Sequence, residues 1–356
     1  MNRTYIIAEA GVNHNGSMIM AKDLIDVAAE AGADAVKFQT FRTEEVISRF
    51  APKAPYQEQL TPAGESQFEM VRRLQLNEIQ HEELIRYCQS KNIEFISTPF
   101  DLYSVDLLVH RLKVSRLKIA SGEITNAPLI LKAARTGTNI ILSTGMSNLG
   151  EVETALGVLA FGYSEVDKKP SPAAFRASYT SEEGQRYLKE KVTVLHCTTE
   201  YPAPFEDINL CAMDTLQQAF GLKVGYSDHS PGIIVPIAAA ARGAAVIEKH
   251  FTLDRNLPGP DHKASLDPTQ LKEMVTSIRQ VEVSLGSPRK FASRSELKNL
   301  PLVRKSLVAR KEIKYGEAFT EDNLGIKRPG TGVEPIYFWD YLGKIAAKDY
   351  QVDEEI

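Results

Sequence analysis

The sequence predicts a closed parallel (β/α)8 barrel, a TIM barrel, followed by a small and mostly β C-terminal domain. Short apolar segments alternate with amphipathic helical segments over residues 1–286. Ionisable and hydroxyl side chains follow each apolar segment, as they do at the active-site end of such barrels. Beyond residue 304, short β-rich segments are interrupted by glycine, which is typical of a small β domain.

Eight short segments have the composition of buried strands, because aliphatic and β-branched residues predominate in them. They are Tyr5–Ala8, Ala35–Phe38, Glu94–Ile96, Leu117–Ala120, Asn139–Leu142, Val192–Leu195, Lys223–Tyr226 and Ala245–Ile247. An open, doubly wound sheet is the alternative arrangement of such units. That fold more often has a glycine-rich dinucleotide turn after an early strand, and this sequence has none. We therefore favour the closed barrel.

The segments between the strands have helical patterns. Residues 18–32 place apolar side chains at helical spacing, namely Ala21, Leu24, Ile25, Ala28 and Ala31. Residues 84–92 precede the third strand, and residues 236–243 lead into the eighth with Gly243 as a helix stop.

Two longer stretches also predict helices. After the eighth strand, Asp267 is expected as N-cap, Pro268 as first helical residue and Gln270 as the partner in a capping box. Residues 163–190 are long and polar for a barrel connection, so we expect an extra helix there.

The domain boundaries follow from a change in charge composition and periodicity near residue 287. Residues 1–286 are predicted to form the barrel, residues 287–304 a linker and residues 305–356 the small domain. The stretch from 287 to 305 has six basic residues against one acidic residue and little periodicity, which favours a solvated linker.

Composition excludes several classes of partner. The net charge is −4 and no basic block dominates, which argues against nucleic acid. The start of the chain lacks the apolar run of a signal peptide, and no stretch approaches membrane-spanning length. The three cysteines, Cys88, Cys197 and Cys211, are widely spaced, as in reduced proteins. We therefore expect a cytoplasmic protein without a membrane partner.

Polar and ionisable side chains lie in or just after each predicted strand. They are Glu9, Lys37, Gln39, Ser97, Thr98, Lys118, Ser121, Glu123, Ser143, Thr144, His196, Thr198, Tyr201, Ser227, Asp228, His229, Glu248, Lys249 and His250. Because the carboxyl ends of all strands meet at one rim of a parallel barrel, these side chains are expected to converge on one site. Merely solvated loops would favour Asn, Asp and Gly instead.

A pair of histidines at this rim predicts a metal site. His229 and His250 end adjacent predicted strands, so their imidazoles are expected within reach of one cation. Two neutral imidazoles with open positions suit Mn²⁺, Mg²⁺ or Co²⁺, completed by water and substrate oxygens. Zinc would usually need a third protein ligand, and no nearby cysteine or HExxH pattern supplies one. The alternative is a pair of core histidines bonded to backbone.

Two lysines predict an anion site at the same rim. Lys37 and Lys118 lie on different strands and are expected to face one cavity with three hydroxyls, which suits phosphate and carboxylate groups. The hydroxyls are those of Ser121, Ser143 and Ser227. An ion pair, or a Schiff-base nucleophile as in aldolases, is the alternative for either lysine. Glu9 and Glu123 are candidates for proton transfer and for binding sugar hydroxyls, or for salt bridges to these lysines.

Nine ordered motifs resemble the sialic acid synthase family, whose members condense phosphoenolpyruvate with an amino sugar to make nonulosonic acids. They are "AEAGVNHNGS" (8–17), "VKFQT" (36–40), "STPFD" (97–101), "KIASGE" (118–123), "LSTGM" (142–146), "HCTTEYPAP" (196–204), "GYSDHS" (225–230), "EKHFT" (248–252) and "GPDHKASL" (259–266). In addition, "KRPGTG" (327–332) resembles that family's antifreeze-like SAF domain. The resemblance covers nearly the whole chain.

The resemblance implies a role for each matching residue. The catalytic residues would be Glu9, Glu123, His229 and His250, with the two histidines as metal ligands. Phosphoenolpyruvate would be bound by Lys37, Lys118, Ser121, Ser143, Ser227 and Tyr201. The sugar would be bound by Phe38, Gln39, Glu123, Thr199, Asp261 and Arg328. Arg328 is expected to reach the barrel of a partner subunit, which implies a homodimer with exchanged C-terminal domains.

Two positions depart from the sialic acid branch, which tends to have His in place of Phe38 and Asn in place of Thr199. The sequence is more similar to the legionaminic acid synthases, whose sugar is 2,4-diacetamido-2,4,6-trideoxymannose. The expected products are N,N'-diacetyllegionaminic acid and phosphate. The alternatives are a sialic acid synthase that uses N-acetylmannosamine, a Schiff-base aldolase, and a non-enzymatic glycan- or ice-binding protein.

The eighth strand ends on three ionisable residues, Glu248, Lys249 and His250. Strand alternation puts Glu248 and His250 on one face and Lys249 on the other. We therefore expect Glu248 to orient the site and Lys249 to point away from it.

Overall fold

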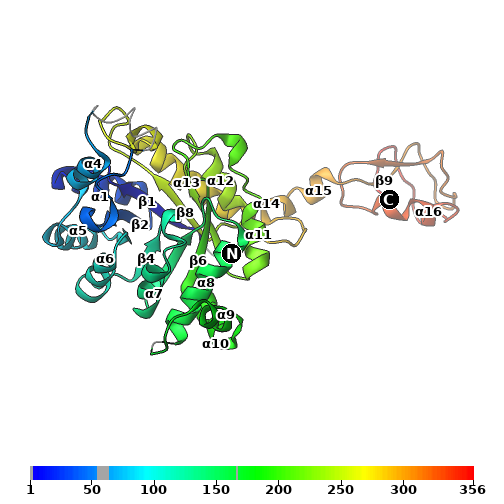
Figure 1. The fold of residues 1–356 in the computed structure, drawn as a ribbon. Coiled ribbons are helices and arrows are strands. Elements are labelled where there is room, and N and C mark those ends of the chain that lie inside the picture. Colours follow the sequence, from blue (N-terminus) through cyan, green and yellow to red (C-terminus); the bar gives the residue numbers. More distant parts are fainter. Residues whose placement is uncertain (1–2, 54–63, 166) are drawn as a thin grey trace. The chain divides into compact units, whose positions relative to one another are not determined.

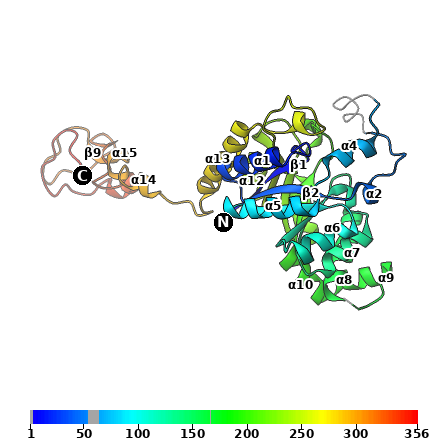
Figure 2. The ribbon, with the colours of Figure 1, turned by 90° about the vertical axis from the view of Figure 1, so that its left-hand side faces the viewer.

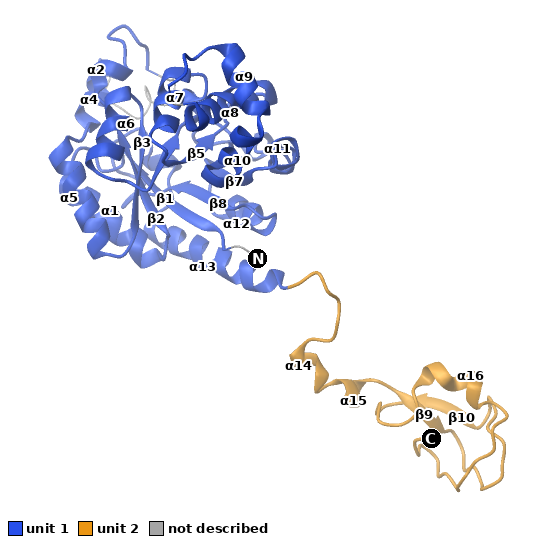
Figure 3. Cartoon of the chain, turned by 90° about the horizontal axis from the view of Figure 1, so that it is seen from below, with its two compact units in different colours: residues 1–286 blue, residues 287–356 orange. Residues whose placement is uncertain are grey.

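The structure, a computed structural model, describes residues 3–53, 64–165 and 167–356. It divides into two compact units, Met1–Gly286 and Ser287–Ile356 (Figure 3). Among the described residues, no helix has both the length and the apolar character that crossing a bilayer requires.

The first unit is a closed parallel barrel of eight strands with helices on its outer side (Figures 1 and 2). The strands are β1 (Tyr5–Gly11), β2 (Ala35–Thr40), β3 (Glu94–Pro99), β4 (Arg116–Ile119), β5 (Asn139–Ser143), β6 (Val192–Cys197), β7 (Lys223–Asp228) and β8 (Val246–His250). β8 pairs with β1 in parallel and closes the sheet. The predicted TIM barrel is confirmed, and the open sheet is excluded.

Helices follow the strands, and some connections between strands contain additional helices. They are α1 (Met18–Ala31), α2 (Thr43–Val46), α4 (Gln67–Leu74), α5 (Glu78–Ser90), α6 (Leu102–Asp106), α7 (Ala127–Arg135), α8 (Leu149–Ser164), α9 (Pro172–Thr180), α10 (Glu182–Lys191), α11 (Ala212–Phe220), α12 (Ile234–Ala241) and α13 (Pro268–Leu285). Shorter helical turns are η1 (Leu107–Arg111), η2 (Ser121–Glu123), η3 (Phe205–Asp207) and η4 (His262–Ala264). The predicted capping box of α13 is present: the Asp267 side chain accepts from the Gln270 amide at 2.8 Å, and Gln270 accepts in return from the Asp267 amide.

Most strands extend further toward the site than the apolar segments predict. β1 continues to Gly11, β2 to Thr40, β6 to Cys197, β7 to Asp228 and β8 to His250. Many of the polar residues expected just after the strands therefore lie inside them. Because ladder hydrogen bonds hold these residues, the alternation of the strand decides which of them point into the barrel.

The barrel interior is layered. Its lower part is an apolar cluster with one residue from each of six strands, Ile7, Ala35, Ile96, Ile141, Leu195 and Val246. Two residues further along several of these strands the inward side chains become polar, as in Glu9, Lys37 and Glu248. A second and larger apolar core fills the space between the outer faces of the strands and the helices. The site thus rests on a dry plug of aliphatic side chains.

The long connection between β5 and β6 contains two helices, α9 and α10, in addition to α8, whereas the sequence predicted one extra helix. Each begins at a serine cap, Ser171 for α9 and Ser181 for α10. Both helices pack against α8, and the rings of Phe161 and Phe175 meet edge to face at 5.2 Å. This cover explains why α8 is buried on nearly all sides.

The second unit is small and built around an antiparallel pair of strands, β9 (Ser306–Ala309) and β10 (Leu324–Lys327). Three isolated bridges tie the remaining chain to it, and Leu307, Phe319 and Leu324 lie in its core. Its helical turns are α14 (Arg294–Leu297), α15 (Leu300–Val303), η5 (Pro335–Tyr337) and α16 (Phe338–Tyr341). The residues predicted as a linker therefore include two single-turn helices, α14 and α15.

Candidate active site

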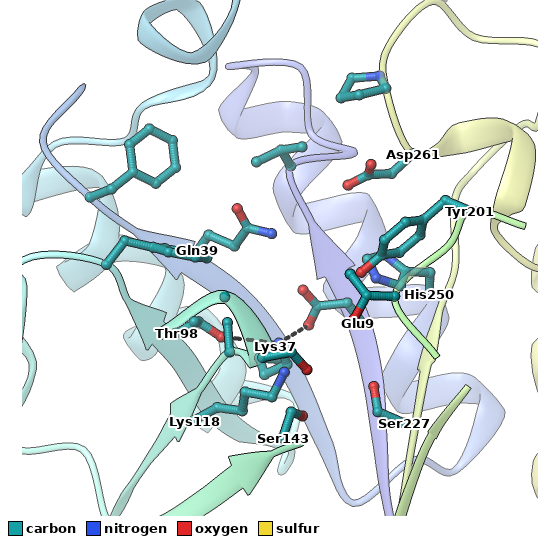
Figure 4. Close-up of a pocket in the computed structure, with 18 of the residues that line it drawn as sticks. Glu9, Lys37, Gln39, Thr98, Lys118, Ser143, Tyr201, Ser227, His250 and Asp261 are labelled. Atoms are coloured by element: carbon teal, nitrogen blue, oxygen red, sulfur yellow. Dashed lines mark hydrogen bonds and ion pairs between the residues drawn. The ribbon is translucent and has the colours of Figure 1, made fainter. Parts of the chain in front are cut away.

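A cavity of about 310 Å³ opens at the carboxyl ends of the barrel strands (Figure 4). Its floor is a layer of four buried ionisable side chains, Glu9, Lys37, Lys118 and Glu248, from four different strands. Strand alternation places all four inward, directly above the apolar plug.

The four floor residues form one network of ion pairs. Lys37 Nζ lies 2.8 Å from a carboxylate oxygen of Glu9 and 3.6 Å from Glu248. Lys118 Nζ lies 3.1 Å from the other oxygen of Glu248, which also accepts a hydrogen bond from the Ser227 hydroxyl at 2.9 Å. Lys37 donates in addition to the Thr98 hydroxyl at 3.1 Å (Figure 4). The floor is therefore charge-balanced, and a bound anion would compete with the two glutamates for the two lysines.

The two glutamates of the floor have opposite pKa shifts. Burial raises the pKa of Glu9 to about 7, and its one close lysine only partly offsets this. Burial would also raise the pKa of Glu248, but Lys118, Lys37 and the Ser227 hydroxyl hold it well below its usual range. Glu248 is thus a permanent carboxylate, whereas Glu9 is able to exchange a proton near neutral pH.

His229 and His250 meet above this floor, with ring centroids 5.6 Å apart. The Nδ1 atom of His229 donates to the Thr198 carbonyl at 2.6 Å, which leaves the lone pair on Nε2. The Tyr201 ring centroid lies 4.2 Å from that of His229 with the planes tilted by 33°, and the same ring meets His250 edge-on. Burial lowers the pKa of His229 to about 4 and that of His250 well below its ordinary value. Both rings are therefore neutral at pH 7.

This pair fits a divalent cation that also takes ligands from water or substrate. Neutral imidazoles are good ligands for such cations, and within the described part of the chain the buried Nδ1 of His250 has no hydrogen-bond partner. Among the described residues, no cluster of three or more His, Cys, Asp or Glu side chains has the geometry of a metal centre. A closed structural zinc site therefore does not fit, whereas an open catalytic site does.

Hydroxyl groups line another part of the cavity. The Ser143 and Thr199 hydroxyls are buried and have no hydrogen-bond partner among the described residues. The Ser121 hydroxyl accepts from the Gly145 amide at 2.9 Å and lies 3.0 Å from the Cys197 sulfur. A Cβ atom at Gly145 would lie 2.2 Å from the Thr199 hydroxyl, so a side chain at this position would fill the space. Unpartnered buried hydroxyls next to lysines are suited to an anionic ligand.

The cavity brings together most of the predicted site residues. Those that line it are Glu9, Lys37, Gln39, Lys118, Ser121, Ser143, Thr199, Tyr201, Ser227, His229, His250 and Asp261. Burial raises the pKa of Asp261 to about 6. Glu123 does not line the cavity. It lies in η2 at the end of β4 and accepts a hydrogen bond from Asn126 at 2.7 Å. Arg328 belongs to the second unit and follows β10.

Phe38 is a correction to the predicted sugar site. It alternates with Lys37 and Gln39 on β2, so it points out of the barrel and is fully buried in the outer core. Its ring stacks on that of Phe95 at 5.7 Å. Phe38 therefore packs behind the site and does not contact a ligand in the cavity.

An apolar wall was not foreseen from the sequence. It consists of Val12, Phe41, Val46, Ile47, Met70, Val71, Leu74 and Phe100. These residues come from α2, α4 and the ends of β1, β2 and β3, and most form a small hydrophobic cluster of their own. Val12, Phe41 and Phe100 follow strands, where no period shows which side faces a ligand. The apolar spacing of Met70 and Leu74 on α4 indicates a buried side but does not show that this side lines a cavity.

Comparison with known proteins places these features in a family context. The NeuB family model matches residues 24–290, and the SAF domain model matches residues 304–354. The chain is 52% identical to the N,N'-diacetyllegionaminic acid synthase of Campylobacter jejuni over 356 residues, 100% of this chain and 99% of the relative. It is 45% identical to the enzyme of the same name from Legionella pneumophila over 339 residues, 95% of this chain and 89% of the relative.

Less similar proteins share the fold. The human N-acetylneuraminate-9-phosphate synthase is 34% identical over 99% of this chain and 91% of its own length. The crystal structure of the N-acetylneuraminic acid synthetase from Leptospira borgpetersenii, in complex with citrate, is 34% identical with a TM-score of 0.67, over 84% of this chain and 90% of that one.

Proposed function

The chain belongs to the NeuB family, and we infer that it is a phosphoenolpyruvate-dependent N,N'-diacetyllegionaminic acid synthase. It condenses phosphoenolpyruvate with 2,4-diacetamido-2,4,6-trideoxymannose and water, and releases phosphate. The observation that carries this inference is the floor of the cavity. There, two buried lysines and a carboxyl with a pKa of about 7 lie beneath two neutral histidines.

The lysines and hydroxyls are proposed to bind phosphoenolpyruvate. Its phosphate and carboxylate would compete with Glu9 and Glu248 for Lys37 and Lys118, with the Ser143 hydroxyl as a further donor. Ser121, Ser227 and Tyr201 complete the proposed contacts, since all three line the same cavity. Binding would keep Glu9 close to the reacting C2 carbon.

The proposed reaction forms one carbon–carbon bond and consumes one water molecule. C3 of phosphoenolpyruvate attacks the aldehyde carbon of the open-chain sugar, whose oxygen becomes a hydroxyl, and positive charge develops at C2. Water adds to C2 as Glu9 accepts one of its protons, which replaces the proton taken up by the aldehyde oxygen. The tetrahedral species loses phosphate by C–O cleavage, the remaining proton of that water leaves with the phosphate, and an α-keto acid is formed. Lys37 and Lys118 stabilise the phosphate and carboxylate throughout.

A divalent cation is part of this proposal. His229 and His250 would hold Mn²⁺, or alternatively Mg²⁺ or Co²⁺, which polarises the aldehyde oxygen when bound. The hydrogen bond from His229 Nδ1 to the Thr198 carbonyl presents Nε2 to the cavity side of the ring.

The apolar wall supports the choice of sugar. The 6-methyl group and the 4-acetamido methyl group of the proposed substrate need apolar contacts, whereas N-acetylmannosamine has hydroxyls at both positions. Met70 and Leu74 on α4 and Phe100 after β3 offer such contacts in the wall of the cavity. Gln39, Thr199 and Asp261 are proposed to bind the polar groups of the sugar, with Glu123 close to the rim.

We also propose a homodimer in which Arg328 contacts the sugar bound by the partner subunit. Large apolar side chains are exposed in the segments that follow barrel strands, among them Leu102, Met146, Phe205 and Ile234. Exposed apolar residues of the second unit include Ile326, Ile336, Tyr337 and Trp339. Such side chains are typical of surfaces that are covered in an assembly. The three cysteines are free, in keeping with the proposed cytoplasmic location.

One experiment tests the function directly. The protein is incubated with Mn²⁺, phosphoenolpyruvate and either 2,4-diacetamido-2,4,6-trideoxymannose or N-acetylmannosamine, and phosphate release and product mass are measured. We expect turnover with the first sugar and much slower turnover with the second. Preference for N-acetylmannosamine would contradict the substrate assignment, and inertness with both would contradict the reaction.

A Schiff-base aldolase is disfavoured by the ion pairs of both lysines. Burial would lower the pKa of Lys37, but Glu248 and Glu9 outweigh burial and raise it, so the amine is protonated and not nucleophilic. Borohydride reduction in the presence of pyruvate should therefore trap no adduct. A trapped adduct on Lys37 or Lys118 would restore the aldolase hypothesis.

A further inference from the structure

Lys249 does not face the cavity, yet it lies in a fully buried ion pair. Its Nζ atom is 2.5 Å from a carboxylate oxygen of Asp228, and both side chains are 0% exposed. The same ammonium donates to the Ser230 carbonyl, and the other Asp228 oxygen accepts from the Ser230 amide at 3.0 Å. We refer to Asp228, Ser230 and Lys249 as the clamp.

The clamp lies at the point where β7 and β8 present the two histidines. Asp228 directly precedes His229, and Lys249 directly precedes His250. The parallel ladder between the two strands ends at the pair formed by Asp228 and Lys249. Beyond this pair the chain leaves β7 with His229, so the clamp fixes the last register position before both imidazoles.

The two rings depend on this register to different degrees. His229 is held by the Thr198 carbonyl at its ring and by the Ala203 amide at its own carbonyl. For His250, the Leu266 amide holds the backbone carbonyl, but no group in residues 3–53, 64–165 or 167–356 forms a hydrogen bond with the buried Nδ1 atom. The direction of the His250 ring is therefore set mainly by its backbone and by packing.

An ion pair is an unusual choice for this position if stability alone matters. On the same face of β8, Ile247 before Lys249 and Phe251 after it are buried in the outer core. A buried ion pair seldom stabilises a protein more than a well-packed apolar pair would, but it tolerates far fewer arrangements. The clamp is thus better suited to defining one geometry than to adding stability.

We propose that Lys249 and Asp228 are positioning residues, which set the separation and orientation of the His229 and His250 imidazoles. This inference rests on the proposed function, because it assigns the clamp to the same cation-binding pair. It adds two residues that touch neither substrate nor cation. The clamp acts through the strands: its charges hold the ends of β7 and β8 in register, and the histidines follow.

The test measures cation binding without turnover. Full-length protein is titrated with Mn²⁺ in the presence of phosphoenolpyruvate and no sugar, and free Mn²⁺ is followed by electron paramagnetic resonance. The variants are Asp228→Asn and the double variant Asp228→Asn/Lys249→Met, which removes both charges at nearly constant volume. The matched control is Arg279→Met, which breaks an ion pair with Asp34 between α13 and the barrel. Thermal unfolding is recorded for every protein.

We expect the double variant to remain folded and to bind Mn²⁺ at least tenfold more weakly than the wild type. The Arg279→Met variant should unfold at a lower temperature but keep the wild-type affinity within twofold. Unchanged affinity in the double variant would show that the clamp is only structural and overturn the proposal. If the double variant aggregates, Asp228→Asn alone is judged by the same criterion. Absence of Mn²⁺ binding to the wild type would instead contradict the metal site, and with it the clamp.

Discussion

Two carboxylates in one layer of the barrel are given opposite tasks by their neighbours. Glu248 lies between Lys118 and Lys37 and accepts from Ser227, whereas Glu9 has one close lysine. The same burial therefore leaves Glu248 ionised and lets Glu9 titrate near neutrality. At this scale, the number of cationic neighbours assigns the role of each acid.

Replacing Glu9 by glutamine should remove the proton acceptor while retaining the shape of the site. We expect kcat to fall by about a hundredfold to ten-thousandfold with little change in KM, the range typical of a lost general base. Steady-state phosphate release measures both constants. The control is Glu94→Gln, since Glu94 begins β3 at the opposite end of the barrel and bonds to Arg116. A loss of less than tenfold would exclude Glu9 as the base.

The pH dependence should carry the signature of the same group. The pKa of Glu9 is raised to about 7 without ligand, and a bound anion beside Lys37 would raise it further. The carboxyl therefore becomes protonated as the pH falls through that value or a higher one, and kcat should fall with it. The profile is measured with phosphoenolpyruvate saturating, so that titration of the free substrate does not contribute. This fall of kcat at acidic pH should be absent from the residual activity of the Glu9→Gln variant. The histidines cannot account for it, because the pKa of His229 is lowered to about 4.

Alternation predicts the direction of side chains well where a residue lies inside a strand. It placed Glu248 and His250 together and turned Lys249 away, as the structure has them. The same rule shows why Phe38 could not line the cavity between the inward residues Lys37 and Gln39. The charge partners of these residues come from other strands, and no pattern within one strand identifies them.

Among the elements, α4 and the neighbouring loops contribute the part of the site that has no charge. Met70, Val71 and Leu74 lie on one side of α4, where Met70 and Leu74 are buried. The barrel strands supply the polar floor, and these appended elements supply the apolar wall. The proposed chemistry and the proposed substrate preference are therefore assigned to different elements.

A polar substitution in the wall should change substrate preference more than catalysis. We expect Met70→Gln to raise KM for the diacetamido-trideoxy sugar about tenfold, because a methyl contact is replaced by a polar group. The ratio of kcat/KM for this sugar over N-acetylmannosamine should fall. Met213→Gln on α11 is the control, since Met213 is buried in the core and does not line the cavity. Equal changes in both variants would mean that the effect is one of stability.

Element boundaries could be predicted where a local rule determines them. The start of α13 follows from its capping box, and the eight strands follow from their apolar composition. The two helices over 163–190 were underestimated, because their serine caps resemble ordinary polar loop residues until the covered face of α8 is seen. The burial of α8 beneath α9 and α10 is a tertiary contact, and it leaves no periodic pattern in the sequence.

At the scale of the whole molecule, the chain comprises a catalytic unit and a small unit with its own core. The proposed assembly gives the small unit a task in the partner's site. A single sequence cannot establish this, because the residues concerned interact between two copies of the chain and not within one.

Loss of Arg328 should impair the reaction without weakening the barrel. We expect Arg328→Ala to lower kcat/KM for the sugar by about tenfold to a hundredfold, as for a lost charged hydrogen bond. The melting temperature should stay unchanged, and light scattering should give twice the mass of one chain for both proteins. The control is Arg310→Ala in the same unit, because Arg310 is exposed and has no proposed contact with the sugar. A monomeric wild type with full activity would contradict the assembly.

The layered barrel also implies an order of substrate binding and product release. Among the described residues, aliphatic side chains from six strands close the interior below the lysines, so ligands are expected to enter and leave at the carboxyl ends of the strands, between the wall and the histidines. A ligand of the lysines lies deepest, and a sugar bound above it blocks the exit. Phosphoenolpyruvate should therefore bind first and phosphate leave last, which makes phosphate a competitive inhibitor toward phosphoenolpyruvate and noncompetitive toward the sugar. The apolar plug thus implies an ordered mechanism, in which the substrate that binds first gives the product that leaves last.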